Sequence, residues 1–206
     1  MWVARRISTP HVGKSEIAKS RMRTAAGIIA RNGALGVATM QVVAGHGAGT
    51  LQLHSFVENM SHGSKVSMSV SADPSWAALM ADRESTPSAE VVGPDLARLV
   101  AGTPNPANQA MMVREYVMGR ENLQAAVAMV PDLQKMTAAA NVNTTMWAPV
   151  IGSEMNRIAV VYSAADLMAL GNGVDEVGMS DAFQALVTEA AKLGTLDRSF
   201  IMSAFH

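Results

Sequence analysis

The sequence contains two similar halves, and this internal repeat constrains the fold more than any other feature. The segment from Ser75 to Met80 matches the segment from Ala182 to Val187 in its order of aromatic, alanine and aliphatic positions, at an offset of 107 residues. Upstream, Thr39-Met40 corresponds to Thr145-Met146 at an offset of 106. Repeats at a fixed spacing mark copies of one structural unit. We therefore expect two copies of one fold, each taking about half of the 206 residues.

Both halves show the same order of expected elements: a strand, a helix, two strands, a broken helical stretch and a final strand. Apolar residues three or four positions apart indicate the helices, and β-branched and leucine-rich runs between turn residues indicate the strands. Asp73-Pro74 is typical of a helix start and predicts a break in the first broken stretch. Gly45-x-Gly47-x-Gly49 predicts a hairpin turn. The expected elements are 2–8, 15–31, 34–44, 50–57, 58–85, 90–101, 110–118, 121–140, 142–151, 156–163, 164–193 and 196–205.

The segment Gly102-Thr103-Pro104-Asn105-Pro106 has the composition of a linker. It predicts a first domain of residues 1–103 and a second of residues 104–206. A βαββαβ unit places both of its helices on one face of its sheet. Apolar residues occupy adjacent strand positions, as at Val160 and Val161, which indicates strands buried on both faces. We therefore predict an α+β fold in which two ferredoxin-like repeats pack their antiparallel sheets face to face as a barrel.

This arrangement resembles the dimeric α/β-barrel superfamily, in a version where a tandem repeat in one chain replaces the two-chain dimer. The resemblance covers nearly the whole chain and rests on the order of the elements. Members of the superfamily include cofactor-independent monooxygenases, isomerases, haem-dependent enzymes and ligand-sensing domains, so the resemblance implies a fold but no single activity. In its tandem haem-dependent members the proximal histidine lies in the second repeat, where this chain has no histidine between Gly63 and Phe205. We therefore expect neither haem nor another cofactor.

The composition narrows the expected partners. The formal net charge is −1 and no long basic run is present, so a nucleic-acid partner is not expected. The chain has no cysteine and no two histidines at helical metal-ligand spacing, so no metal site is expected. We expect a cytoplasmic protein without a membrane partner, because the first residues do not form a secretory signal and no long apolar segment is present. Only 16% of the residues are charged and 49% are hydrophobic, which favours a homo-oligomer.

Charged residues inside predicted strands are the candidate site residues, because a charge buried without a partner is costly. Arg5 and Arg6 lie in the first strand of one repeat, and Arg114 and Glu115 lie in the first strand of the other. One interpretation is that Arg5 or Arg114 holds an anionic substrate inside the barrel, with Glu115 or His54 as proton acceptor. Three aromatic residues would form the walls of such a site: Tyr116, Trp147 and Tyr162. The alternative interpretation is an internal ion pair or an oligomer interface.

Two functions of different classes fit these residues. The first is a small-molecule binder, or a cofactor-independent enzyme of the oxygenase or isomerase type. Its ligand would be a small organic anion, held in the barrel interior or in the cleft between sheet and helices. The second is a structural or assembly module whose barrel is filled by its own side chains. An enclosed cavity of about 300 Å³ or more favours the first, and a filled interior favours the second.

Overall fold

The computed structural model describes all 206 residues and contains two halves with the same order of main elements. The first half consists of β1 (Trp2–Pro10), α1 (Ser15–Arg31), β2 (Gly36–Gly45), β3 (Leu51–Val57), α2 (Met60–Ala72), α3 (Pro74–Ser85) and β4 (Ala89–Ala101). The second half consists of β5 (Ala110–Val117), a short turn of helix at Arg120–Asn122, α4 (Leu123–Ala138), β6 (Asn143–Ile151), β7 (Arg157–Ala164), α5 (Leu167–Gly173), a π-helical turn at Val174–Gly178, α6 (Asp181–Ala190) and β8 (Thr195–Ala204).

The eight strands form one closed barrel in the order β1-β3-β2-β8-β5-β7-β6-β4, and all the pairings are antiparallel. The two halves join where β2 pairs with β8 and where β4 pairs with β6. The predicted α+β fold of two ferredoxin-like repeats is confirmed. The facing sheets also pair with each other at both edges, which closes them into a single barrel. The division at residue 103 into two domains stays a prediction.

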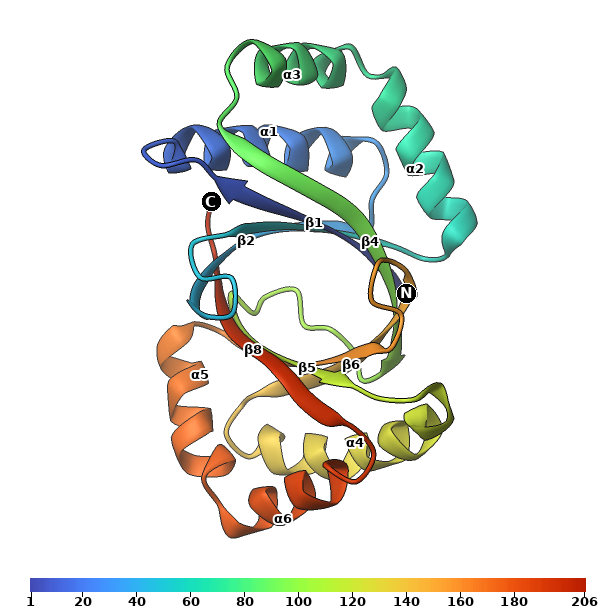
Figure 1. The fold of residues 1–206 in the computed structure, drawn as a ribbon, viewed down its shortest axis with the longest axis vertical. Coiled ribbons are helices and arrows are strands. Elements are labelled where there is room, and N and C mark those ends of the chain that lie inside the picture. The colour runs from blue at the N-terminus through green and yellow to red at the C-terminus, as the bar shows by residue number, and fades with distance from the viewer.

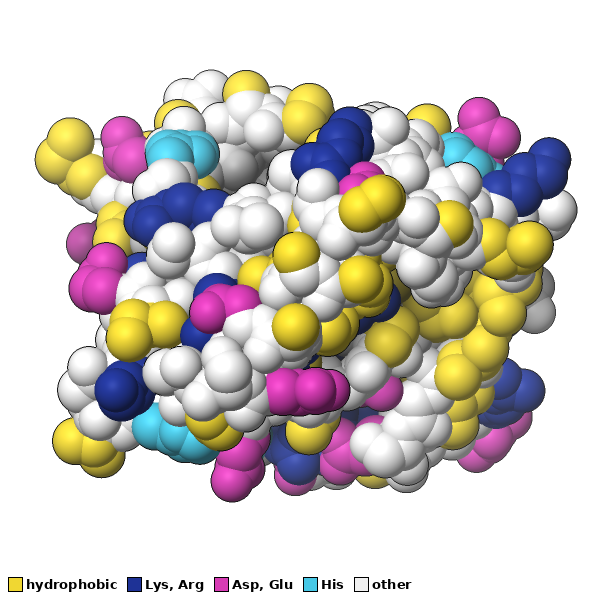
Figure 2. Space-filling model, turned by 90° about the horizontal axis from the view of Figure 1, so that it is seen from above, with side chains coloured by type: hydrophobic (Ala, Val, Ile, Leu, Met, Phe, Trp, Pro, Cys, Tyr) yellow, Lys and Arg dark blue, Asp and Glu magenta, His cyan; other side chains and the backbone are white.

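The helices cover the outside of the barrel. Figure 1 shows α1 to α3 over one outer face and α4 to α6 over the opposite face, with the barrel between them. One apolar cluster lies between the helices and the sheet of each half, and a third lies inside the barrel. Figure 2 looks onto the face formed by α1 to α3, where basic and acidic side chains are interspersed. No helix has the length and the apolar character that crossing a membrane requires.

Local sequence signals account for the helix boundaries. The side chain of Asp73 accepts a hydrogen bond from the backbone N–H of Ser75 at 2.9 Å, and Pro74 begins α3. The broken helical stretch therefore divides at the predicted position. Ser180 caps α6 in the same way, since its hydroxyl accepts from the backbone N–H of Phe183 at 3.3 Å. The equivalent helices of the two repeats thus start with the same kind of cap.

The glycine-rich segment after β2 forms the predicted hairpin turn. Gly45, Gly47 and Gly49 all have positive φ angles, a backbone conformation that residues other than glycine rarely adopt. A Cβ on Gly45 would lie only 2.3 Å from the carbonyl oxygen of Ser199 in β8. Glycine at this position therefore allows the two halves to approach closely.

Candidate functional site

The largest of the three main hollows lies between the helices and the sheet of the first half. It measures about 350 Å³ and is called the first-half cavity below. Helices α1 and α3 form one wall, and strands β1, β3 and β4 form the other. Residues that line it include Arg6, Ser8, Met22, Leu53, Trp76 and Leu79. Its volume lies within the usual range for small-molecule sites.

Arg6 places an unpaired positive charge at the first-half cavity. Successive strand residues point to opposite faces, so Arg6 lines this cavity while Arg5 lines the barrel interior. Burial alone lowers the pKa of the Arg6 guanidinium below its ordinary value, and no carboxylate opposes that shift. Arg6 is half-buried, and partial burial of a cation without a partner has a cost that a bound anion would reduce.

Two more arginines line this cavity, and they differ in the hydrogen bonds that they make within the protein. Arg21 donates a hydrogen bond to the side chain of Asp82 at 2.6 Å and another to its backbone carbonyl at 2.9 Å. These bonds hold α1 against α3, so the guanidinium of Arg21 is not free to bind a ligand. Arg83 instead donates only to the sulfur of Met80, at 3.6 Å. Arg6 and Arg83 are therefore the cations available to a ligand.

The strand registers identify the residue equivalent to Arg6 in the second half. Arg6 lies opposite Leu53 where β1 pairs with β3. Arg114 lies opposite Val160 where β5 pairs with β7, at nearly the same offset as the sequence repeat. Arg114 is therefore the counterpart of Arg6, and both side chains face the helices of their own half.

Aromatic side chains fill the space around Arg114. By the same registers, Tyr116 replaces Ser8. The sequence repeat and the matching helix caps place Phe183 where the first half has Trp76. Phe183 is only 2% exposed, and its ring centroid lies 6.4 Å from that of Tyr162. The guanidinium carbon of Arg114 lies 5.8 Å from the Phe183 ring centroid and 5.9 Å from that of Tyr162. These rings compensate the charge through cation–π contacts. Tyr116 adds bulk at the position where the first half has the small Ser8 at its cavity.

A smaller cavity lies inside the barrel and is called the barrel cavity below. It measures about 150 Å³, so the interior is neither filled nor as large as a typical small-molecule site. It brings together four of the residues predicted from sequence: Arg5, His54, Glu115 and Trp147. Three others do not line it: Arg114, Tyr116 and Tyr162. Strand alternation explains the division, because Glu115 faces inward and its neighbours in β5 face the helices.

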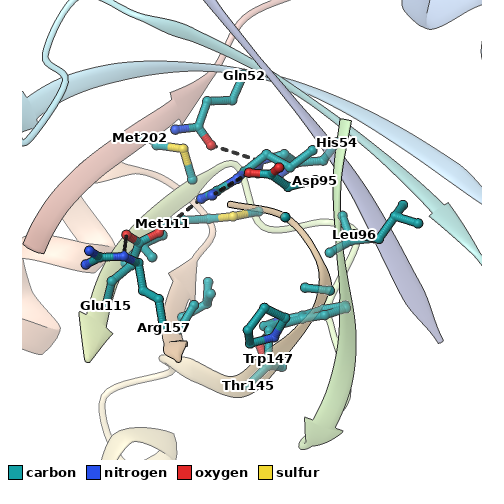
Figure 3. Close-up of a pocket in the computed structure, with 18 of the residues that line it drawn as sticks. Gln52, His54, Asp95, Leu96, Met111, Glu115, Thr145, Trp147, Arg157 and Met202 are labelled. Carbon is teal, nitrogen blue, oxygen red and sulfur yellow. Dashed lines mark hydrogen bonds and ion pairs between the residues drawn. The ribbon is translucent and has the colours of Figure 1, made fainter. Parts of the chain in front are cut away.

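The charges around the barrel cavity neutralise one another. Arg5 Nη1 lies 3.0 Å from Glu115 Oε1, and Arg5 Nη2 lies 3.7 Å from Asp95 Oδ2. Arg157 Nε lies 3.8 Å from the other oxygen of Glu115. An internal ion pair, the alternative interpretation of these charges, therefore joins Arg5 of one repeat to Glu115 of the other. Figure 3 shows Glu115 and Arg157 together on one side of the cavity, away from His54.

His54 is neutral in this environment. Burial, reinforced by the positive charge of Arg5, lowers its pKa to about 3. Its Nε2 lies 3.1 Å from Oε1 of Gln52. An imidazole with this pKa is a weak base at pH 7, which removes the reason for expecting His54 to accept protons there.

Sequence reasoning named Arg6 but gave it no role. The available signal was the adjacency of Arg5 and Arg6 in one strand, since alternation sends one of them to each face of the sheet. The repeat also held a signal, because it aligns Trp76 with Phe183. The open space beside Trp76 depends on the small side chain of Ser8, which no local pattern marks.

Comparison with solved structures places the whole chain in one fold. A candidate monooxygenase from Fusobacterium nucleatum superposes with a TM-score of 0.66 at 8% identity, over 100% of this chain and 92% of that one. A candidate monooxygenase from Lactobacillus acidophilus gives 0.60 at 11% identity, over 99% and 98%. A heme-binding protein from Thermus thermophilus gives 0.52 at 10% identity, over 100% and 91%. The chain has the dimeric α/β-barrel fold.

Identities this low show the fold alone. No family model and no curated protein matches the sequence. The function of this single-chain barrel must therefore be inferred from its own residues.

Proposed function

We propose that the protein binds a small organic anion with a flat apolar body in the first-half cavity. The observation that carries this proposal is Arg6, a half-buried guanidinium without a carboxylate partner beside a cavity of about 350 Å³. A carboxylate would give Arg6 a charge-assisted hydrogen bond, which is stronger than a neutral one. Arg83 adds a second cation to the lining of the same cavity.

The apolar lining of the cavity determines the shape and character of the uncharged part of the ligand. Leu53 and Leu79 are buried, and the indole of Trp76 provides an aromatic wall. Flat aromatic bodies pack well against such surfaces. An aromatic carboxylate of one or two rings is therefore the simplest ligand that satisfies both the charge and the walls.

Haem does not fit the residues that line either cavity. A haem iron needs an axial histidine, cysteine, methionine–histidine pair or tyrosine. The first-half cavity has no histidine, cysteine or tyrosine in its lining. The barrel cavity, at about 150 Å³, is smaller than a typical small-molecule site, so it has no room for the larger haem. The heme-binding description of the Thermus thermophilus neighbour is therefore not carried over to this chain.

Replacement of Arg6 by methionine tests the proposed site, because methionine keeps an unbranched side chain and removes the charge. We expect the affinity for 2-naphthoate to fall by about 10- to 100-fold in calorimetric titration. The affinity for the uncharged 2-naphthamide should stay the same in both proteins. Arg6→Met is not expected to destabilise the fold, since it removes a half-buried charge that has no partner.

Arg114→Met is the matched control, because it removes the equivalent cation from the filled half. It should leave the affinity for 2-naphthoate unchanged. The proposal is wrong if 2-naphthoate and smaller aromatic acids do not bind the parent protein, or if Arg6→Met binds them as tightly as the parent.

An oxygenase reaction without a resident cofactor is the second candidate function. It is favoured by the two full-length structural neighbours described as candidate monooxygenases. In such a reaction, an electron-rich ring held at the first-half cavity would itself supply electrons to dioxygen. With a dihydroxynaphthoate as substrate, we expect dioxygen uptake above the protein-free rate in the parent and in Arg114→Met, and its loss in Arg6→Met. Uptake equal to the protein-free rate would rule this reaction out for that substrate.

A further inference from the structure

The barrel cavity is a second hollow, lined by residues of both halves and separate from the first-half cavity. It lies between inward-facing residues of the barrel, and the interior cluster of Met40, Val42, Val113, Phe200 and Met202 fills only part of that interior. The cavity measures about 150 Å³. This volume is about that of one benzene ring, and the lining combines apolar side chains with polar ones.

The electrostatics of this cavity disfavour a charged ligand. Its charged side chains form ion pairs within the protein. Arg5 pairs with Glu115 at 3.0 Å, and Arg157 pairs with Glu154 at 2.7 Å. A ligand carrying one more charge would have to break a pair or remain uncompensated, and both are costly in a buried site. The barrel cavity therefore differs from the first-half cavity, where one arginine has no partner.

One polar group in the barrel cavity remains available to a ligand. The amide oxygen of Gln52 can only accept a hydrogen bond, so Nε2 of His54 carries the imidazole proton. In the neutral ring Nδ1 is then an acceptor, and the only side-chain hydrogen bond of the ring is the one that Nε2 makes to Gln52. Since every fully buried side-chain nitrogen and oxygen has a partner, Nδ1 has accessible surface. His54 is 9% exposed and lines the cavity. A ligand that enters with an O–H or N–H group finds an acceptor there.

Aromatic and thioether side chains supply the remaining contacts. The rings of Phe56 and Trp147 lie 6.2 Å apart between centroids, and both line the cavity. Met111 and Met202 also line it, as Figure 3 shows together with His54 and Trp147. Aromatic and sulfur-containing walls favour an aromatic ligand.

We propose that the barrel cavity binds a small uncharged aromatic molecule carrying one hydrogen-bond donor, the class of which phenol is the simplest member. The donor is directed to His54, and the ring lies among Trp147, Met111 and Met202. This site is independent of the proposed anion site, because the two cavities open on opposite faces of the same strands.

The test uses phenol and its isostere toluene, which lacks the donor. Both are titrated into the parent protein, Ala159→Leu and His54→Leu, with the methyl NMR signals of Met111 and Met202 as the readout. Ala159 lines the cavity, and leucine there fills it. We expect both ligands to shift the two methyl signals, Ala159→Leu to abolish those shifts, and His54→Leu to reduce the preference for phenol over toluene about fivefold.

Arg6→Met is the control for independence and should bind phenol as the parent does. The proposal is overturned if phenol leaves Met111 and Met202 unshifted in the parent, or if Ala159→Leu binds phenol with the parent's affinity. It is also overturned if His54→Leu keeps the parent's preference for phenol. Should a variant fail to fold, the methyl shifts in the parent protein still decide whether the cavity is the site.

Discussion

Replacement of Phe183 by alanine is expected to lower the free energy of unfolding by about 3 to 5 kcal/mol, because it removes a large buried ring. Phe183 is 2% exposed and packs against Tyr162 and Arg114. Its removal also leaves a space beside Arg114, at the position that Trp76 holds in the wall of the first-half cavity. We therefore expect Phe183→Ala to bind two equivalents of 2-naphthoate where the parent binds one, as measured by calorimetric titration.

Phe200→Ala is the matched control for this prediction. Phe200 is 4% exposed and belongs to the cluster inside the barrel, away from Arg114. Its replacement should destabilise the protein by a similar amount without creating a carboxylate site. The loss of a buried ring should cost several kcal/mol in the free energy of unfolding. A decrease of less than about 1 kcal/mol in Phe183→Ala would therefore mean that the ring does not fill this space. An unchanged stoichiometry would mean that Arg114 is not the equivalent of Arg6.

Acidification from pH 7 to pH 4 is expected to lower the free energy of unfolding by roughly 3 kcal/mol through His54 alone. The pKa of His54 is about 3 in the folded protein, against an ordinary value of 6.5. Between these values the unfolded chain binds a proton that the folded protein does not bind. The stabilisation is therefore complete above about pH 6.5 and is lost as the pH falls, by about 1.4 kcal/mol per pH unit. Urea unfolding at a series of pH values measures this slope.

His54→Gln separates this effect from that of the carboxylates. The variant should unfold with little dependence on pH between 7 and 5. Below pH 4 it should still lose stability, because hydrogen bonds from Asn32 and from the Ser75 backbone lower the pKa of Asp73 to about 2. Such a depressed carboxylate stabilises the fold above its ordinary pKa, and its contribution is lost as the pH falls. Parallel curves for parent and variant between pH 7 and 5 would show that His54 is not buried as a neutral ring.

Much of the fold was predictable because its signals are local or periodic. Ser15 to Arg31 forms a single helix with the predicted bounds, and the break at Asp73 follows from capping and proline geometry. Adjacent apolar residues in β7 correctly indicated a strand covered on both faces. Val160 packs toward the helices, and Val161 packs toward the barrel interior. The pairing of β2 with β8 was not predictable, since contacts between distant edges leave no local pattern.

The candidate site was predictable only in part, for a geometric reason. Sequence reasoning grouped Arg5, Arg114 and Tyr162 in one interior, whereas strand alternation sends Arg5 to the barrel and the other two toward the helices. The ion pair between Arg5 and Glu115 spans 110 positions of sequence, so no spacing rule could reveal it. Self-association and a cytoplasmic location stay predictions.

The central claim is that the two halves are copies of one fold, of which only the first keeps an open cavity beside its copy of the repeated arginine, Arg6, where we propose that an anion binds. Methyl NMR of the methionines tests it directly, because Met22 and Met80 line that cavity. Met118 and Met155 line a hollow of about 250 Å³ in the second half, beside Arg98 and Arg120. Titration with 2-naphthoate should shift the signals of Met22 and Met80 and leave those of Met118 and Met155 in place. Shifts confined to Met118 and Met155, or no shift at either pair, would contradict the account.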